Sequence, residues 1–85
     1  MFEVNWALAL RTQSEVRVSA LIIKNEKAEI VRFELPLPLQ GEGWEEYLIR
    51  MLNTISESDV EKAAIIQDII DHLPKRRRNR RRSRR

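Results

Sequence analysis

Apolar and polar residues alternate with a period of two along residues 2–11. One parity holds Phe2, Val4, Trp6, Leu8 and Leu10, and the other holds Glu3, Asn5, Ala7, Ala9 and Arg11. This period is typical of a β-strand with one buried face. The pattern therefore predicts a first strand that turns its large apolar side chains, Trp6 among them, toward the core.

Two further segments alternate in the same way, at about 15–24 and 28–35. Their expected core positions are Val16, Val18, Ala20 and Ile22 in the first and Val31, Phe33 and Leu35 in the second. Polar breaks of hairpin-loop length, at residues 12–14 and 25–27, separate the three segments. Such short loops favour an antiparallel meander, because parallel neighbours need long crossover connections.

Three apolar residues fall on the opposite parity from the expected core positions of their strands: Leu21, Ile23 and Ile30. Two interpretations remain open. A bend or bulge absorbs them into the core, or they form a second apolar patch that a partner subunit covers.

The period changes after the segment Leu35-Pro36-Leu37-Pro38-Leu39, whose prolines cannot donate hydrogen bonds to a sheet. Helical spacing then relates Trp44, Tyr47, Leu48, Met51, Leu52 and Ile55. Ser58 to Glu61 has the Ser-x-x-Glu form of a capping box and predicts the start of a second helix. The apolar stripe of that helix consists of Val60, Ala63, Ile66, Ile70 and Leu73, widened by Ile65 and Ile69, and Pro74 ends it.

The predicted order is β-β-β-α-α, followed by a basic tail. The expected fold is α+β, a three-stranded antiparallel meander with two helices packed on one face of the sheet. A chain of 85 residues supports one modest core. We therefore expect residues 1–74 to form one small domain and residues 75–85 to form a separate tail.

The net charge of +3 conceals a strong division along the chain. Residues 75–85 hold nine positive charges and no negative ones, whereas residues 1–74 hold seven basic and thirteen acidic side chains, a net of −6. All 36 hydrophobic residues also lie in 1–74. A segment without apolar residues, whose like charges repel, is predicted to be disordered when free.

Eight of the nine cations in the tail are arginines. A guanidinium grips phosphate through two parallel hydrogen bonds and stacks on exposed bases, which a lysine ammonium cannot do. The composition therefore favours nucleic acid, RNA ahead of DNA, as the partner. The expected binding residues are Lys75, Arg76, Arg77, Arg78, Asn79, Arg80, Arg81, Arg82, Arg84 and Arg85.

The run Arg77-Arg78-Asn79-Arg80-Arg81-Arg82 resembles the arginine-rich motifs of viral RNA-binding proteins. The resemblance implies that the arginines hold phosphates and that Asn79 reads a base pair. The alternative is that Asn79 is only a polar spacer. Ser83 follows three arginines, which is the form of a site for a basophilic kinase.

Other functions of the tail stay open. It could be a nuclear localisation signal in a eukaryotic host, or it could pair with an acidic protein, so that the chain is a protein-interaction module. The run 44–48 together with 55–57 resembles the C-terminal half of a small plastid and cyanobacterial ribosomal protein family, with a spacing that differs by two residues. That resemblance keeps association with the ribosome as an option. No membrane anchor is expected beside the tail.

No set of residues in the chain predicts catalysis. The absence of cysteine excludes disulfides and thiolate chemistry. His72, the only histidine, lacks a nucleophilic partner, and no metal or cofactor site is expected. The sequence therefore predicts a protein that is not an enzyme.

The domain itself is not expected to touch nucleic acid. The second helix is acidic, and the expected polar face of the first strand carries neither aromatic nor several basic side chains. The start of the chain lacks the basic and apolar run of a signal peptide, which favours the cytoplasm, or the nucleus in a eukaryote.

Overall fold

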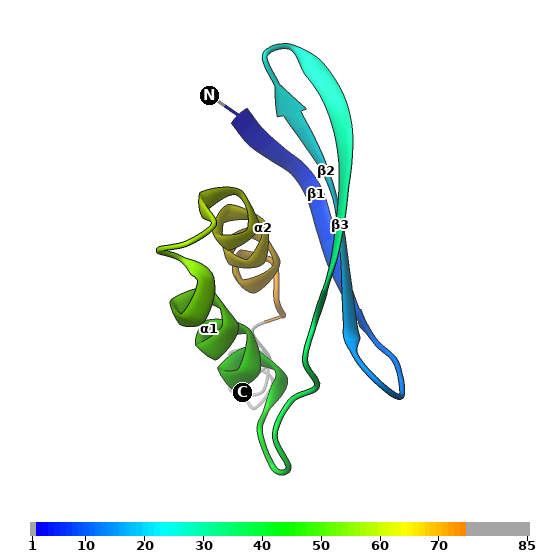
Figure 1. Cartoon of the computed structure of the whole chain (residues 1–85), viewed down its shortest axis with the longest axis vertical. Coiled ribbons are helices and arrows are strands. Elements are labelled where there is room, and N and C mark those ends of the chain that lie inside the picture. The colour runs from blue at the N-terminus through cyan, green and yellow to red at the C-terminus, as the bar shows by residue number, and fades with distance from the viewer. Residues whose placement is uncertain (1, 75–85) are drawn as a thin grey trace, which may run out of the picture.

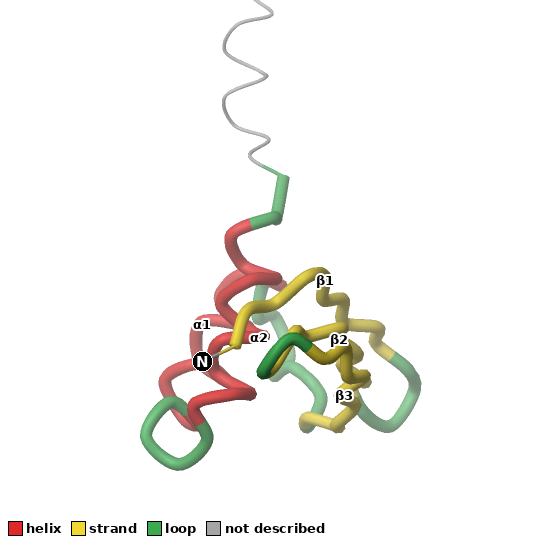
Figure 2. The backbone as a smooth tube through the Cα atoms, turned by 90° about the horizontal axis from the view of Figure 1, so that it is seen from above, coloured by secondary structure: helices red, strands yellow, loops and turns green. Residues whose placement is uncertain are grey.

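The computed structural model describes residues 2–74, which form three strands and two helices. The elements are β1 (Phe2–Arg11), β2 (Val16–Lys24), β3 (Lys27–Leu35), α1 (Trp44–Ile55) and α2 (Val60–Asp71). The strands form one antiparallel sheet in the order β1-β2-β3. Both helices lie on the same side of this sheet, and no other described element covers the opposite side (Figure 1, Figure 2). The predicted α+β meander is confirmed, while the calls on residues 75–85 lie outside the described residues.

The inner face of the sheet follows the predicted parity in β2 and β3. Val16, Val18, Ala20, Ile22, Phe33 and Leu35 are buried there. From the helices, Tyr47, Leu48, Met51, Ile65, Ile66 and Ile69 complete the same core. The strand-period and helix-period residues thus meet in a single apolar layer, which is the main source of stability in a fold of this kind.

The predicted facing of β1 is wrong beyond Val4. Val4 pairs with Ile22 and Trp6 pairs with Leu21, so Asn5 has no partner and forms a β-bulge. The extra residue inverts the alternation, so that Phe2 and Val4 share the inner face with Ala7 and Ala9. Trp6, Leu8 and Leu10 point to the opposite side and are 40%, 52% and 60% exposed.

The β2–β3 hairpin closes through a two-residue turn. Asn25 and Glu26 both have positive φ, 53° and 66°, and Lys24 pairs with Lys27 across the turn. This conformation corresponds to a type I′ turn, whose twist matches that of the flanking strands. Asparagine tolerates the left-handed region well, whereas glutamate adopts it at a cost in conformational energy.

The second helix begins one residue later than predicted. Asp59, not Ser58, is its N-cap, and the Asp59 carboxylate accepts a hydrogen bond of 3.1 Å from the backbone N–H of Lys62. Val60 therefore lies in the first turn and is 70% exposed instead of contributing to the apolar stripe. The helix ends at Asp71, two residues before the predicted end.

The connector between β3 and α1 is held to the first helix by a buried tyrosine. The Tyr47 hydroxyl donates a hydrogen bond to the carbonyl of Pro36, and the Tyr47 side chain is fully buried. Its ring stacks against Trp44, with ring centroids 5.4 Å apart. Tyr47 therefore fixes where α1 starts relative to the end of β3.

Candidate functional site

One side of the sheet packs against the helices, and the opposite side carries apolar residues that are not part of the core. We call this opposite side the outer sheet face. Its residues are Glu3, Trp6, Leu8 and Leu10 of β1, Arg17, Ser19, Leu21 and Ile23 of β2, and Ala28, Ile30, Arg32 and Glu34 of β3. Leu21, Ile23 and Ile30 thus lie on a second apolar face, as one of the two sequence interpretations held.

Apolar side chains gather toward β1 and the β2–β3 turn on this face. The strand register places Trp6, Leu21 and Ile30 side by side in one row across the sheet. Ile30 is 49% exposed, and Leu8 and Leu10 extend the apolar area along β1. Exposed apolar residues that are contiguous in this way mark interaction sites more often than single surface residues do.

The remaining corner of the outer sheet face is charged but balanced. Arg17 donates from Nε to the Glu15 carboxylate at 2.7 Å, and Glu34 lies opposite Arg17 in the register. These carboxylates raise the pKa of Arg17, chiefly through the hydrogen bond to Glu15. Arg32 pairs with Ser19 in the next row. A shallow hollow of about 260 Å³ lies over this corner and over Leu8 and Leu10.

The negative charge of the domain belongs entirely to its helical half. Residues 2–41 contain five acidic and five basic side chains, so the sheet half has no net charge. Residues 42–74 contain eight acidic and two basic side chains, a net of −6. A polyanion is therefore repelled by the helices and not by the sheet.

Both cations of the helical half are held in ion pairs. Arg50 binds the Glu42 carboxylate through two hydrogen bonds of 2.7 and 2.8 Å, and Lys62 lies 3.7 Å from Asp59. The Arg50 pair, together with the backbone N–H of Leu39, lowers the pKa of Glu42 to about 2. Lys24 of the sheet reaches across to Glu61 at 2.6 Å. These cations are thus already partnered within the domain.

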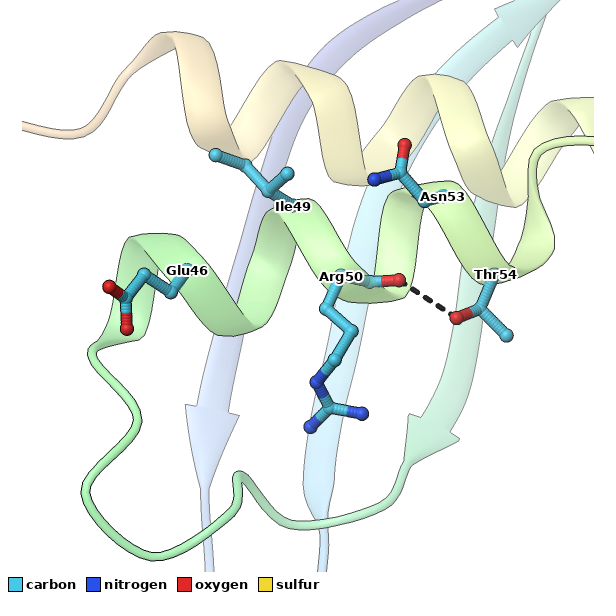
Figure 3. Close-up of a pocket in the computed structure, with 5 residues that line it drawn as sticks. All are labelled: Glu46, Ile49, Arg50, Asn53 and Thr54. Carbon is cyan, nitrogen blue, oxygen red and sulfur yellow. Dashed lines mark hydrogen bonds between the residues drawn. The ribbon is translucent and has the colours of Figure 1, made fainter.

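The outward side of α1 carries an open depression of about 440 Å³, lined by Glu46, Ile49, Arg50, Asn53 and Thr54 (Figure 3). Thr54 donates its hydroxyl hydrogen to the backbone carbonyl of Arg50 at 2.8 Å. The Arg50 side chain extends away from the helix toward the connector, where Glu42 holds it. Since its one cation is engaged elsewhere, the depression offers little chemistry to a ligand.

A second hollow, of about 510 Å³, lies between the start of α1 and the end of the described chain. Gly43, Trp44, Glu45, Glu46, Leu73 and Pro74 line it. Glu46 accepts a hydrogen bond from the Gly43 backbone N–H at 3.1 Å, which caps α1. Pro74, the last described residue, therefore lies beside the acidic start of α1.

His72 is the C-cap of α2. Its Nδ1 donates to the Asp68 carbonyl at 2.8 Å and lies 3.7 Å from the Asp68 carboxylate. The hydrogen bond and the nearby charge raise the pKa of His72, and the imidazolium suits the negative end of the helix dipole. The histidine has a structural explanation at the helix end.

Glu42, Glu45 and Glu46 do not act as one group, since two of them are engaged with different partners and Glu45 is exposed. Within residues 2–74, no three acidic or histidine side chains come together as a metal ion would need. The helices of this part of the chain are also too short and too polar to cross a membrane. The predicted binding residues, Lys75 to Arg85, and the predicted phosphorylation site Ser83 lie outside the described residues.

Sequence reasoning missed the exposed row of Trp6, Leu21 and Ile30, because it assumed an uninterrupted first strand. The signal available in the sequence was the pair Ala7 and Ala9, whose small side chains suit a position close beneath a helix. Comparisons of the chain with protein-family models, with curated proteins and with solved structures found no match. They lend no support to the partial ribosomal resemblance.

Proposed function

We propose that this protein binds RNA through its arginine-rich C-terminal segment and is not an enzyme. One observation carries the proposal: nine cations, eight of them arginine, lie within the last eleven residues without a single acidic side chain. Phosphate contacts by arginine supply affinity largely independent of sequence. Guanidinium stacking on unpaired bases favours single-stranded RNA over duplex DNA.

The distribution of charge in the domain supports a division of labour. The helical half carries −6, and four of the seven cations of residues 2–74 already form ion pairs. The domain therefore adds little positive potential of its own, and the segment after Pro74 supplies the attraction for phosphate. In this proposal the domain positions the arginine-rich segment and contributes protein contacts.

The test compares the full chain with a truncation to residues 1–74 in binding to single-stranded RNA, duplex RNA and duplex DNA. The truncation keeps every residue of the core, all of which lie between Phe2 and Leu73. If all nine cations of one chain engage on a strand short enough to bind a single arginine-rich segment, log K falls with log salt at a slope of about −6, from ~0.7 per phosphate. The truncation is expected to show no measurable binding.

Three full-length variants sharpen this test. Replacing the eight tail arginines by lysine keeps the charge and removes the planar forks, so it is expected to leave the salt slope nearly unchanged and to reduce the preference for single-stranded RNA. Lys27→Gln, an exposed position of β3 on the other parity from the outer sheet face, is the matched control and should leave RNA affinity almost unchanged. Equal binding by the full chain and the truncation would refute the proposal. Asn79→Ala tests whether Asn79 reads a base pair. If it does, the substitution lowers affinity for one RNA hairpin and not for others; if Asn79 is only a spacer, affinity for every hairpin stays the same.

A second candidate function has its own observation. The exposed apolar row of Trp6, Leu21 and Ile30 suits a protein-interaction module, in which the basic tail is a targeting signal or binds an acidic partner. The cytoplasm is the compartment expected for either function, with the nucleus as the alternative in a eukaryotic host. Binding of the full chain to an acidic protein but not to RNA would favour this second candidate.

A further inference from the structure

We infer that the outer sheet face is a homodimer interface, in which the face of one chain packs against the same face of a second copy. The dimer itself does not depend on RNA binding. The dimer would carry two arginine-rich segments, and the effect that we expect from this on RNA binding rests on the proposed function.

The apolar content of the face is the first argument. Trp6, Leu8, Leu10 and Ile30 are 40–60% exposed, and the register joins them to Leu21 and Ile23 in one continuous area. Aliphatic side chains dominate, which suits the interior of two packed sheets. Single-stranded RNA would need several aromatic platforms, and Trp6 is the only aromatic residue on this face.

Charge complementarity is the second argument, and it selects a second copy over a polyanion. The charged corner holds Arg17 and Arg32 together with Glu15 and Glu34, so its charges cancel. A copy of the same corner therefore meets no net repulsion, and a phosphate backbone finds no net attraction there. Glu3, opposite Ile23, adds one more carboxylate to the outer sheet face. Contact between two helical halves, by contrast, would bring −6 against −6.

The area of the outer sheet face determines how strong a dimer we expect. Three strands of about nine residues span roughly 30 Å by 14 Å, since residues rise ~3.3 Å and strands lie ~4.8 Å apart. Two such faces in contact cover about 850 Å² together, which is below the range of ~1,200–2,000 Å² for stable interfaces. The dimer should therefore be reversible, with a dissociation constant that is about micromolar or weaker.

Sedimentation equilibrium of the full chain over a wide range of concentration measures this association without RNA. Leu8→Glu places a charge in the apolar part of the outer sheet face, on β1, and is expected to give a monomer at every concentration. Ile49→Glu is the matched control, because Ile49 is an apolar residue of α1 that is 42% exposed. This variant should dimerise like the unmodified chain. Leu10→Glu, at the exposed end of β1, is a second interface variant, and circular dichroism checks that each variant is folded.

RNA binding then tests the consequence. On a long single strand the dimer presents eighteen cations, so the salt slope should approach about −12, against about −6 for the Leu8→Glu monomer. Affinity at fixed salt should fall at least about tenfold with this variant, because bivalent attachment is lost. Loss of RNA binding in the 1–74 truncation with dimerisation intact would separate the two proposals.

Several results would overturn the dimer interface. The outer sheet face is not the dimer interface if the unmodified chain stays monomeric. The same holds if a folded Leu8→Glu variant dimerises like the unmodified chain. Trp6→Leu keeps the apolar surface but removes the ring. If it lowers RNA affinity about tenfold without changing the dissociation constant of the dimer, the face binds bases and the inference is wrong.

Discussion

The bulge at Asn5 decides which side chains of β1 meet the helices, and deletion of single residues tests it. Val4 pairs with Ile22 and Trp6 with Leu21, so removal of Asn5 leaves a continuous ladder in which every remaining side chain keeps its face. Asn5 is exposed and unpaired. We therefore expect the deletion to change the free energy of unfolding by less than about 1 kcal/mol, the range of a surface change.

Deletion of Ala7 is the matched control, because it also removes one residue from β1. It forces Trp6 into the inner position that Ala7 occupies beneath α2. Overpacking of a filled core costs about 1–3 kcal/mol, and the apolar row of the outer sheet face loses its largest member as well. The deletion of Ala7 should therefore be the more destabilising of the two by at least about 1 kcal/mol.

Urea unfolding of both deletions measures the free energies, and tryptophan emission reports the facing. In a Trp44→Phe background Trp6 is the only tryptophan. At a concentration well below the dissociation constant of the proposed dimer, its emission should stay red-shifted after deletion of Asn5 and move to the blue after deletion of Ala7. The opposite order of stability, or a blue shift on deletion of Asn5, would refute the assignment of the bulge.

Three further substitutions test local contacts. Glu26→Gly should stabilise the fold by about 0.5–1 kcal/mol in urea unfolding, because glycine accepts the φ of 66° without the steric cost that glutamate bears; a loss of stability would contradict the type I′ turn. Tyr47→Phe should cost about 0.5–1.5 kcal/mol, measured in the same way, since it removes the hydrogen bond that the Tyr47 hydroxyl donates to the Pro36 carbonyl. Because the folded-state pKa of Glu42, about 2, lies below its ordinary 4.5, its pairing with Arg50 adds stability that is complete above about pH 5 and is lost as the pH falls through 4.5 toward 2. Thermal melts should thus decline less steeply between pH 5 and pH 2 for Glu42→Gln than for the unmodified chain, and parallel declines would exclude this pair as a source of acid sensitivity.

Periodicity was sufficient to predict every element and the antiparallel order. The reason is physical: in β2 and β3 the apolar parity is supported by burial of every other residue, and in α1 the buried Tyr47, Leu48 and Met51 keep helical spacing. The ends of α2 shifted because Ser58 and Asp59 both suit an N-cap, and the choice between them depends on how the chain leaves α1. Sequence patterns leave such boundaries open by one or two residues.

Periodicity alone does not predict the facing of β1, because both faces of that strand carry apolar residues. Leu8 and Leu10 compete with Ala7 and Ala9 for the core, and hydrophobicity alone favours the leucines. The structure places the alanines inside because α2 lies against β1, where small side chains allow close approach. The bulge at Asn5 allows this packing and leaves that one residue unpaired.

The same inversion changes what the domain offers to a partner. An uninterrupted β1 would expose Glu3, Asn5 and Arg11 beside the charges of β2. Along β1 the outer sheet face would then offer no large apolar side chain to a partner. The inverted strand instead joins Trp6 and Leu8 to Leu21 and Ile30, an apolar surface on the half of the domain that has no net charge. If a second copy covers that surface, the two acidic helical halves point away from each other, and repulsion between them is least in this arrangement. The charge that keeps phosphate from the helices would then also determine which face of the domain is free to self-associate.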